Sequence, residues 1–155
     1  MKPGEIRPIA ICIFRDRDRL FVAEYYDALD GKFYRPLGGA IEFGERGHEC
    51  IVREIREETG AEIKEITYLG TLESIFSFEG KAGHEIVLVY RARFVEPHLY
   101  EIESLVCRDD GGHFTARWLP LDELRAGPTP LYPDDILDFV DRAEQDGPTS
   151  LNQER

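Results

Sequence analysis

The sequence predicts an α/β domain in which a mixed β-sheet lies between helices. Three observations support this fold class. Short segments rich in β-branched and aromatic residues alternate with turn residues, which is typical of strands. Residues 86–90 are continuously apolar, as expected of a strand that helices cover on both faces. A segment with helical spacing of apolar and charged residues ends at Gly60, and glycine commonly terminates helices.

The elements before this helix follow from apolar runs and turn residues. Apolar patterning predicts strands at residues 6–14 and 19–25, and the polar residues 16–18 predict the turn between them. Residues 27–32 contain Asp30-Gly31, which favours a hairpin turn. Residues 33–35 predict a short strand that leads into a loop at Gly38-Gly39.

The elements after the helix are predicted in the same way. Residues 62–78 and 84–95 indicate strands, the first divided at Gly70, and residues 114–119 indicate another. The polar residues 96–112 predict a mobile loop. Residues 120–124 favour a short helical turn, and Pro133 suits the first turn of a last helix. We expect one domain over residues 1–145 and a polar, disordered tail at 146–155.

Composition limits the classes of function. The chain of 155 residues suits one domain, and it contains no apolar run of 18 residues, so we expect no membrane association. The start of the chain lacks the pattern of a signal peptide. Cys12, Cys50 and Cys107 are odd in number and far apart, which disfavours disulfides and zinc and fits a cytoplasmic protein. The net charge of −12 disfavours duplex nucleic acid as a partner.

Three carboxylates share one face of the predicted helix. Glu54, Glu57 and Glu58 lie at i, i+3 and i+4, so they project from one narrow face. Like charges this close favour a hard divalent cation between them, above all Mg²⁺. Arg53 is placed to reach Glu45 or Glu57 and to hold a carboxylate. A solvated acidic surface is the alternative, although ordinary surface helices alternate charges at i, i+4.

The same stretch resembles the Nudix box of the Nudix hydrolases. Gly39 is followed after five residues by Glu45, and after seven more by Arg53-Glu54-Ile55-Arg56-Glu57-Glu58-Thr59-Gly60. The resemblance implies an α/β/α sandwich. It also implies hydrolysis of a phosphoanhydride with Mg²⁺ as the cofactor, for which Mn²⁺ could substitute. It implies Glu54, Glu57 and Glu58 as metal ligands, with the carbonyl of Gly38 as a further ligand.

The roles of the remaining polar residues are less fixed by the pattern. We expect Glu45 to orient Arg53 or an outer-shell water rather than to bind metal directly. Glu57 is the favoured catalytic base within the box, shared with metal binding. Carboxylates outside the box remain alternatives for the base: Glu85, Glu101 and Glu103.

Substrate recognition leaves a weaker signal. Arg35 precedes the glycines and could reach a phosphate, and Glu85 is a further candidate for contact with substrate. Aromatic residues could stack on a base, although in strands they are more often core: Tyr25, Tyr34, Phe76 and Phe78. Residues 76–78 lack the proline or tyrosine that marks some Nudix subfamilies, which withholds support from ADP-ribose and dinucleoside polyphosphates.

Two functions of different class remain. The first is a metal-dependent pyrophosphohydrolase that splits a nucleoside diphosphate linked to another moiety X, with water attacking phosphorus. The second is a nucleotide-binding or regulatory module without turnover. A sensor has no need for the complete set of Arg53, Glu54, Glu57 and Glu58, so the enzyme is favoured. We expect a small nucleotide-type substrate, and a homodimer is possible because family members are often dimers.

Overall fold

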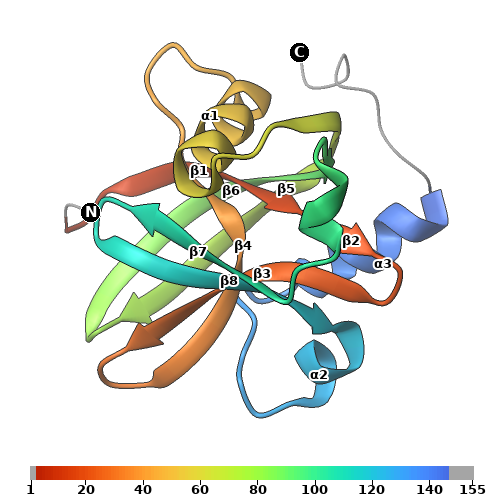
Figure 1. Ribbon diagram of the computed structural model, residues 1–155. Coiled ribbons are helices and arrows are strands. Elements are labelled where there is room, and N and C mark those ends of the chain that lie inside the picture. Colours follow the sequence, from red (N-terminus) through yellow and green to blue (C-terminus); the bar gives the residue numbers. More distant parts are fainter. Residues whose placement is uncertain (1–2, 147–155) are drawn as a thin grey trace.

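The computed structural model describes residues 3–146 (Figure 1). The strands are β1 (Ile6–Ile13), β2 (Arg15–Asp16), β3 (Arg19–Asp27), β4 (Gly31–Ala40), β5 (Ile63–Phe78), β6 (Lys81–Phe94), β7 (Ser104–Asp109) and β8 (Gly112–Pro120). The helices are α1 (Gly47–Thr59), the 3-10 turn η1 (Pro97–Tyr100), α2 (Leu121–Ala126) and α3 (Ile136–Asp146).

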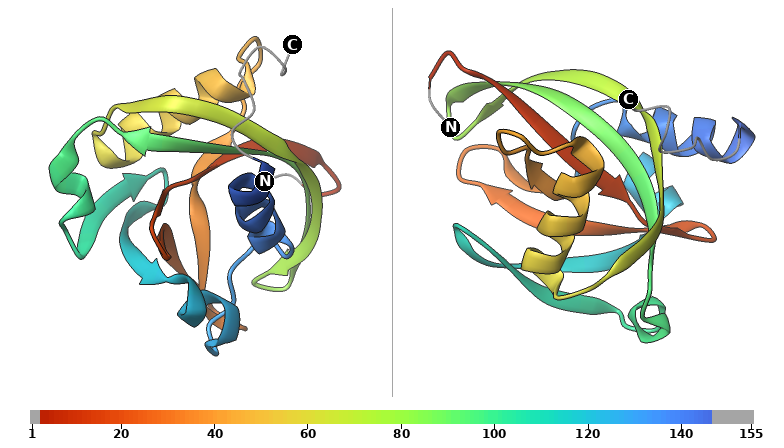
Figure 2. Two further views of the ribbon diagram at one scale, coloured as in Figure 1. Left: turned by 90° about the vertical axis from the view of Figure 1, so that its right-hand side faces the viewer. Right: turned by 90° about the horizontal axis from the view of Figure 1, so that it is seen from above.

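The strands form one mixed sheet in the order β5-β6-β1-β4-β3-β8-β7, with β2 paired to β3. β1 and β6 run parallel, and the other neighbouring strands are antiparallel. β4 changes partner along its length, because residues 37–40 pair with β1 whereas residues 31–36 pair with β3. This change of partner bends the sheet, and the curvature is visible in Figure 2.

Helices cover both faces of the sheet, as the sequence predicts for an α/β/α sandwich. Ile51 and Ile55 of α1 belong to one apolar cluster, with residues of β1, β3, β6 and β8. Phe139 and Val140 of α3 belong to a second cluster, which also includes Leu121 of α2. The two clusters alternate along β1, since Ala10 and Cys12 join the first while Ile9 and Ile11 join the second.

Three predictions of secondary structure are wrong. The two glycines do not form a loop, because β4 continues through Gly38 and Gly39 to Ala40. β5 is one strand of 16 residues, and Gly70 lies at a register shift rather than at a break. Residues 96–112 are not a mobile loop, because they contain η1 and β7. The sequence did not indicate β7, which among the described strands pairs with β8 alone and exposes Val106 on its outer face.

The close contact between β1 and β4 explains why residue 38 is glycine. Gly38 has φ of 154°, a conformation that other residues rarely adopt. A Cβ atom there would lie 2.1 Å from the carbonyl oxygen of Ala10. Only a residue without a side chain lets β4 pair with β1 at this point, and this pairing brings Gly39 beneath α1.

The C-terminal part is close to expectation. α2 covers residues 121–124 of the predicted helical turn, but α3 begins at Ile136, so Pro133 precedes the helix and does not lie in its first turn as predicted. Within residues 3–146, none of the helices combines the length and apolar character needed to cross a membrane. The predicted tail at 146–155 falls, after Asp146, outside the described residues.

Candidate active site

Both ends of α1 are fixed by backbone hydrogen bonds. At the start, the backbone N–H of Arg46 donates to Oε1 of Glu49 at 2.9 Å, which satisfies a group that the helix leaves free. At the end, Gly60 adopts φ of 77° and its N–H donates to the carbonyl of Arg56 at 2.9 Å. Ile51 and Ile55 are fully buried beneath the helix, so its rotation about its own axis is set. His48, in the first turn of the helix, is half-buried.

Arg53 is the centre of a network at this end of the molecule. Its Nε and Nη2 donate to the two carboxylate oxygens of Glu45 at 2.7 and 2.9 Å, a bidentate arrangement. Its Nη1 donates to Glu54 at 3.0 Å, and to Glu57 at 3.4 Å. Its Nη2 also donates to the carbonyl of Ala40 at 3.0 Å. The predicted contact of Arg53 with Glu45 is therefore present, and the guanidinium ties α1 to the end of β4.

This guanidinium controls the charge of Glu45. The hydrogen bonds from Arg53 lower the pKa of Glu45 to about 2, so this carboxylate is ionised at neutral pH. Its two oxygens are both engaged, and one also accepts the backbone N–H of Glu42 at 3.1 Å. Glu45 is thus placed to orient Arg53, as the sequence predicts, rather than to receive a ligand. Glu42 itself is an exposed loop residue, with a side chain 67% exposed.

Glu54 and Glu58 lie directly over the two glycines of β4. A Cβ atom on Gly39 would be 2.4 Å from the carboxyl carbon of Glu54, so only glycine leaves room for this side chain. The backbone N–H of Gly38 donates to the carboxylate of Glu58. The helix and the strand therefore meet at two carboxylates and two glycines, far closer than a helix with ordinary side chains beneath it would permit.

Glu58 is an unusual group for a protein interior. It is 6% exposed, and its Oε1 has no hydrogen-bond partner among the described residues. Burial, followed by repulsion from Glu54 and Asp109, raises the pKa of Glu58 to about 8. Burial also raises the pKa of Glu54. An ionised carboxylate that is buried without full pairing is costly, so this position favours a bound cation or proton.

Two acidic residues that the sequence did not single out approach the same place. Asp109 and Asp110 form the tip of the hairpin between β7 and β8. The charge of Asp109 acts on Glu58, and the charge of Asp110 acts on Glu54. The available signal was the Asp-Asp-Gly-Gly turn, because a tight hairpin turn predicts strands on either side. Treating residues 96–112 as a loop concealed it.

Arg35 provides positive charge at this acidic site. Its Nη2 lies 4.0 Å from Oε1 of Glu85, and Nε of Arg7 lies 3.9 Å from Oε2 of the same carboxylate. The positive charge of Arg35 also lowers the pKa of Glu58, so Arg35 lies within range of both acids. Glu85 is 5% exposed, and Nε of Arg7 is buried without a hydrogen-bond partner among the described residues. The structure thus brings together Arg35 and Glu85, which the sequence named separately.

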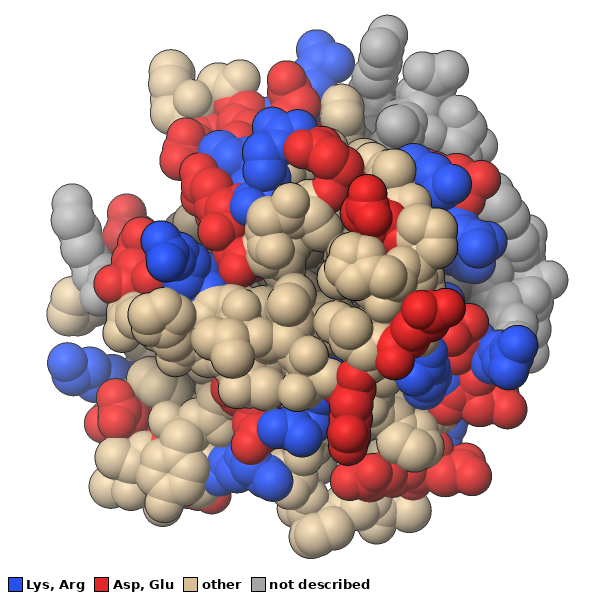
Figure 3. Space-filling view, viewed as in Figure 1, with Lys and Arg blue, Asp and Glu red and all other residues tan. Residues whose placement is uncertain are grey.

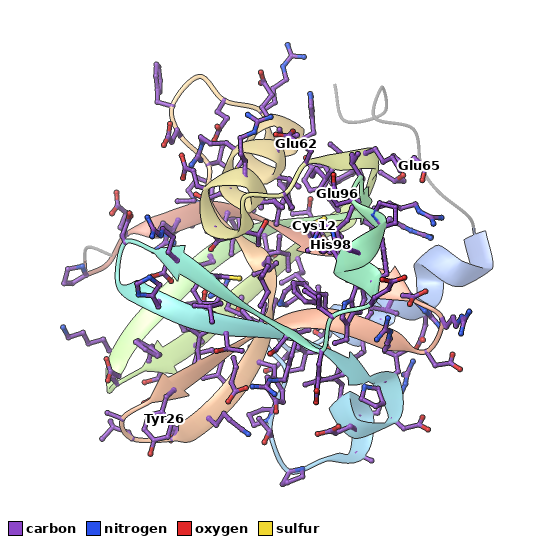
Figure 4. The ribbon with its side chains drawn as sticks, viewed as in Figure 1. Cys12, Tyr26, Glu62, Glu65, Glu96 and His98 are labelled. Atoms are coloured by element: carbon purple, nitrogen blue, oxygen red, sulfur yellow. The ribbon has the colours of Figure 1, made fainter. Side chains whose placement is uncertain are left out.

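Other candidates are not gathered in this way. Glu101 and Glu103 are exposed and precede β7, so they lie at the end of that strand away from Asp109, roughly 20 Å along it. Arg56 turns from the site and pairs with Glu62 at 2.7 Å; Glu62 is labelled in Figure 4. Glu57 is placed on the rim, with a side chain 61% exposed.

The carboxylates of α1 have the right chemistry for a metal ion, but their side chains are not arranged around one. In the part of the chain that the structure describes, no group of three or more His, Cys, Asp or Glu side chains is assembled to hold a metal. Glu54 and Glu57 are engaged by Arg53, whereas Glu58 offers an unpartnered oxygen. Carboxylate oxygens are the ligands that Mg²⁺ prefers, so the donor chemistry fits. Acidic and basic side chains crowd together around α1 in Figure 3.

A mixed sheet thus lies between helices, and α1 carries carboxylates braced by Arg53 over two glycines of β4. A family model described as the NUDIX domain matches residues 5–139. The chain belongs to the Nudix family, which confirms the resemblance drawn from the sequence. Members of this family typically depend on a divalent metal.

Two relatives show how far sequence similarity extends. The NAD-capped RNA hydrolase NudC of Pseudomonas aeruginosa is 32% identical over 91 residues, which are 59% of this chain and 28% of that protein. The putative mutator protein MutT4 of Mycobacterium tuberculosis is 30% identical over 120 residues, which are 73% of this chain and 44% of that protein. The chain therefore matches less than half the length of either relative.

Two solved structures confirm the fold. A NUDIX hydrolase from Nitrosomonas europaea has a TM-score of 0.72 at 16% identity, over 96% of this chain and 95% of that chain. A MutT NUDIX hydrolase from Burkholderia pseudomallei has a TM-score of 0.65 at 21% identity, over 90% of this chain and 98% of that chain. At such low identities the likeness concerns the fold alone.

Proposed function

We propose that this protein is a metal-dependent pyrophosphohydrolase that splits a nucleoside diphosphate linked to another moiety X. The observation that carries the proposal is Glu58, a buried carboxylate with an unpartnered oxygen beside Glu54 and within range of Arg35. A structural role alone gives no reason to keep carboxyl groups together in one buried place where their ionised forms are disfavoured. A cation shared with a phosphate group accounts for it.

The metal set follows the family pattern. Glu54, Glu57 and Glu58, with the carbonyl of Gly38, would hold Mg²⁺, or Mn²⁺ in its place. The bound metal supplies positive charge that offsets the phosphoryl oxygens and makes a water nucleophilic. The chain supplies the placement: Gly39 leaves room for Glu54, and the N–H of Gly38 holds Glu58. Such preorganised charge is worth more in a partly buried site than in water.

The remaining residues have three roles: they position the metal ligands, bind the substrate or transfer a proton. Arg53, clamped by Glu45, positions Glu54 and Glu57 through its hydrogen bonds. Arg35 on β4 is suited to contact a phosphate of the substrate, and Glu85 lies 4.0 Å from its guanidinium. For the general base we retain Glu57, which is exposed at the rim, and add Asp109 as an alternative near Glu58.

The relatives support the substrate class without naming the substrate. One acts on NAD-capped RNA, according to its name, and another is called a mutator protein. The first name concerns a nucleotide cap, which agrees with a nucleotide-type substrate here. A free nucleotide derivative is the substrate class that we propose, because the net charge of −12 disfavours nucleic acid as a partner.

Hydrolysis assays test this function directly. Purified protein with Mg²⁺ or Mn²⁺ is incubated with nucleoside triphosphates, ADP-ribose, dinucleoside polyphosphates and nucleotide sugars, and the products are separated by chromatography. We expect a nucleoside monophosphate and phospho-X from at least one compound, and no turnover in a chelator. Glu58→Gln should lower kcat by about two orders of magnitude, whereas Glu73→Gln, an exposed carboxylate on β5, should not.

Two outcomes would contradict the proposal. The first is full turnover by Glu58→Gln at saturating Mg²⁺. The second is an activity confined to simple phosphate esters with release of inorganic phosphate. Binding of nucleotides without any turnover would instead favour the regulatory module.

A further inference from the structure

A row of aromatic rings crosses the sheet at the hairpin end of β3 and β4. Tyr25 lies between Phe114 and Phe33, with ring centroids 5.2 and 5.7 Å away and nearly parallel planes. Phe33 in turn contacts Phe78 at 6.1 Å and Tyr132 at 5.6 Å. These rings come from five separate segments of the chain, so only the folded protein assembles them.

The row becomes accessible as it leaves the core. Phe114 is buried, Tyr25 and Phe33 are half-buried, and Phe78 and Tyr132 are 38% and 42% exposed. Of the aromatic residues that the sequence proposed for stacking, Tyr34 is instead 5% exposed and belongs to the core under α3. Phe33, which the sequence did not single out, is the residue that joins the exposed rings to the buried ones.

A buried carboxylate holds the exposed rings in place. Asp27, at the end of β3, is 3% exposed. It accepts hydrogen bonds from the backbone N–H groups of Leu29 at 2.8 Å and Glu79 at 3.1 Å. The first lies in its own hairpin, and the second lies in the turn between β5 and β6. Asp27 thus ties the two hairpin tips together, which fixes Phe78 against Phe33.

The row also leads back to the acidic site. Phe33, Arg35 and Leu37 are two residues apart on β4, so their side chains share one face of the strand. Tyr25 pairs with Phe33 across the sheet. Burial and then the charge of Glu58 raise the pKa of Tyr25, which places its hydroxyl within range of that acid. A ligand at Arg35 would therefore be near both the acids of α1 and the ring of Phe33.

We infer that Phe33, Phe78 and Tyr132 form a binding site for the planar ring of the substrate, with its phosphates at Arg35 and the acids of α1. This inference rests on the proposed function and specifies its substrate class: a nucleotide whose base stacks on this cluster. Stacking suits such a site because every base has a flat aromatic face. Rings held by neighbouring rings and by Asp27 are also preorganised, which reduces the entropy lost on binding.

Binding of two product-like probes tests the inference without requiring turnover. Isothermal titration calorimetry measures the Kd of AMP, which carries a base, and of ribose 5-phosphate, which does not. We expect Phe33→Leu and Phe78→Leu to weaken AMP binding by about tenfold and to leave ribose 5-phosphate unaffected. Equal weakening of both probes, or no change in the Kd of AMP, would overturn the inference.

The matched control is Tyr26→Leu. Tyr26 is adjacent to Tyr25 on β3, 72% exposed, and projects at the outer tip of the same hairpin in Figure 4. It makes the same change from aromatic to aliphatic on the opposite face of the strand, so it should leave AMP binding unchanged. A Tyr26→Leu effect as large as that of Phe33→Leu would contradict the site.

Kinetics separate this inference from the proposed function. With a hydrolysed nucleotide, Phe78→Leu should raise KM by about tenfold and leave kcat within about twofold. If Phe78→Leu hydrolyses the nucleotide with an unchanged KM, the ring site is overturned and the proposed function stands. If the wild type hydrolyses nothing but Phe33→Leu still weakens AMP binding, the proposed function is overturned and the ring site stands. Analytical ultracentrifugation tests whether a second copy of the chain covers these rings instead. A wild-type dimer that Phe78→Leu dissociates would contradict the inference.

Discussion

The helices α1 and α3 lie on opposite faces of the same sheet and differ in what they bury. The described side chains that α3 buries are apolar, and its Asp141 is exposed and pairs with Arg125 at 2.6 Å. By contrast, α1 buries Glu58 along with Ile51 and Ile55. Both helices gain stability from apolar contact. The buried carboxyl group of Glu58 gives α1 no such apolar contact, and this is the difference between the two helices.

The glycines beneath the two helices sharpen this difference. Gly39 makes room for the carboxylate of Glu54, whereas Gly70 makes room for the ring of Phe139. The same device, a missing side chain, thus admits a polar group on one face and an apolar group on the other. The face of α1 above Gly39 accommodates a carboxylate, and the face of α3 above Gly70 accommodates an aromatic ring.

The largest expected effect separates the carboxylates of the two helices. Glu54→Gln removes one charge from the metal set, and we expect kcat to fall by about two orders of magnitude. Asp141→Asn makes the equivalent change on α3 and should leave kcat unchanged, because its surface ion pair contributes little. Steady-state kinetics at saturating Mg²⁺ measures both. Comparable kcat values for the two variants would contradict the proposal that the carboxylates of α1, and not those of α3, take part in catalysis.

A smaller loss is expected where the carboxylates are only positioned. Arg53→Lys keeps the positive charge but cannot donate in bidentate fashion to Glu45 while reaching Glu54. We expect kcat to fall by about tenfold to a hundredfold because Glu54 and Glu57 lose their alignment. The concentration of Mg²⁺ that gives half-maximal rate should rise as well. If that concentration and kcat both stay at wild-type values, Arg53 has no positioning role.

The two glycines provide a reciprocal pair of variants. In Gly39→Ala the new Cβ meets only the flexible end of Glu54, so we expect kcat to fall by about tenfold with little change in stability. In Gly70→Ala the Cβ would lie 2.6 Å from the ring of Phe139, at a residue with φ of 150°. The free energy of unfolding should fall by about 1–3 kcal/mol while kcat is retained. Urea unfolding and steady-state kinetics are measured on each variant. A loss of stability in Gly39→Ala with kcat retained, or a loss of kcat in Gly70→Ala with stability retained, would contradict the prediction.

The smallest effect is a pH-dependent change in stability at Asp27, which lies outside both helices. Its hydrogen bonds to Leu29 and Glu79 lower the pKa of Asp27 below its usual 3.8. The ionised form therefore stabilises the folded state above pH 3.8, and this contribution disappears as the pH falls through the lower folded pKa. Asp27→Asn should unfold at a lower temperature than the wild type at pH 7, with the difference shrinking below pH 4. Thermal melts from pH 3 to 7 measure it, and a constant difference would contradict it.

Sequence reasoning succeeded where the relevant residues are close together in the chain. The spacing from Glu45 to Gly60 predicts the helix, its acidic face, the partner of Arg53 and the family, because one helix carries all of them. It failed at β7 and at the course of β4. A strand at a sheet edge needs only a weak alternating pattern, and glycines in a strand look like glycines in a turn until their neighbours are known.

By itself, the sequence determined the family and the row of carboxylates on α1, since the geometry of a helix turns spacing directly into position. The tertiary structure decided which distant groups meet this row. Arg35 and Glu85, fifty residues apart, and the tip at Asp109 and Asp110 converge through the pairing and bending of strands. Such contacts depend on register and twist summed over the whole sheet, and no local pattern encodes them.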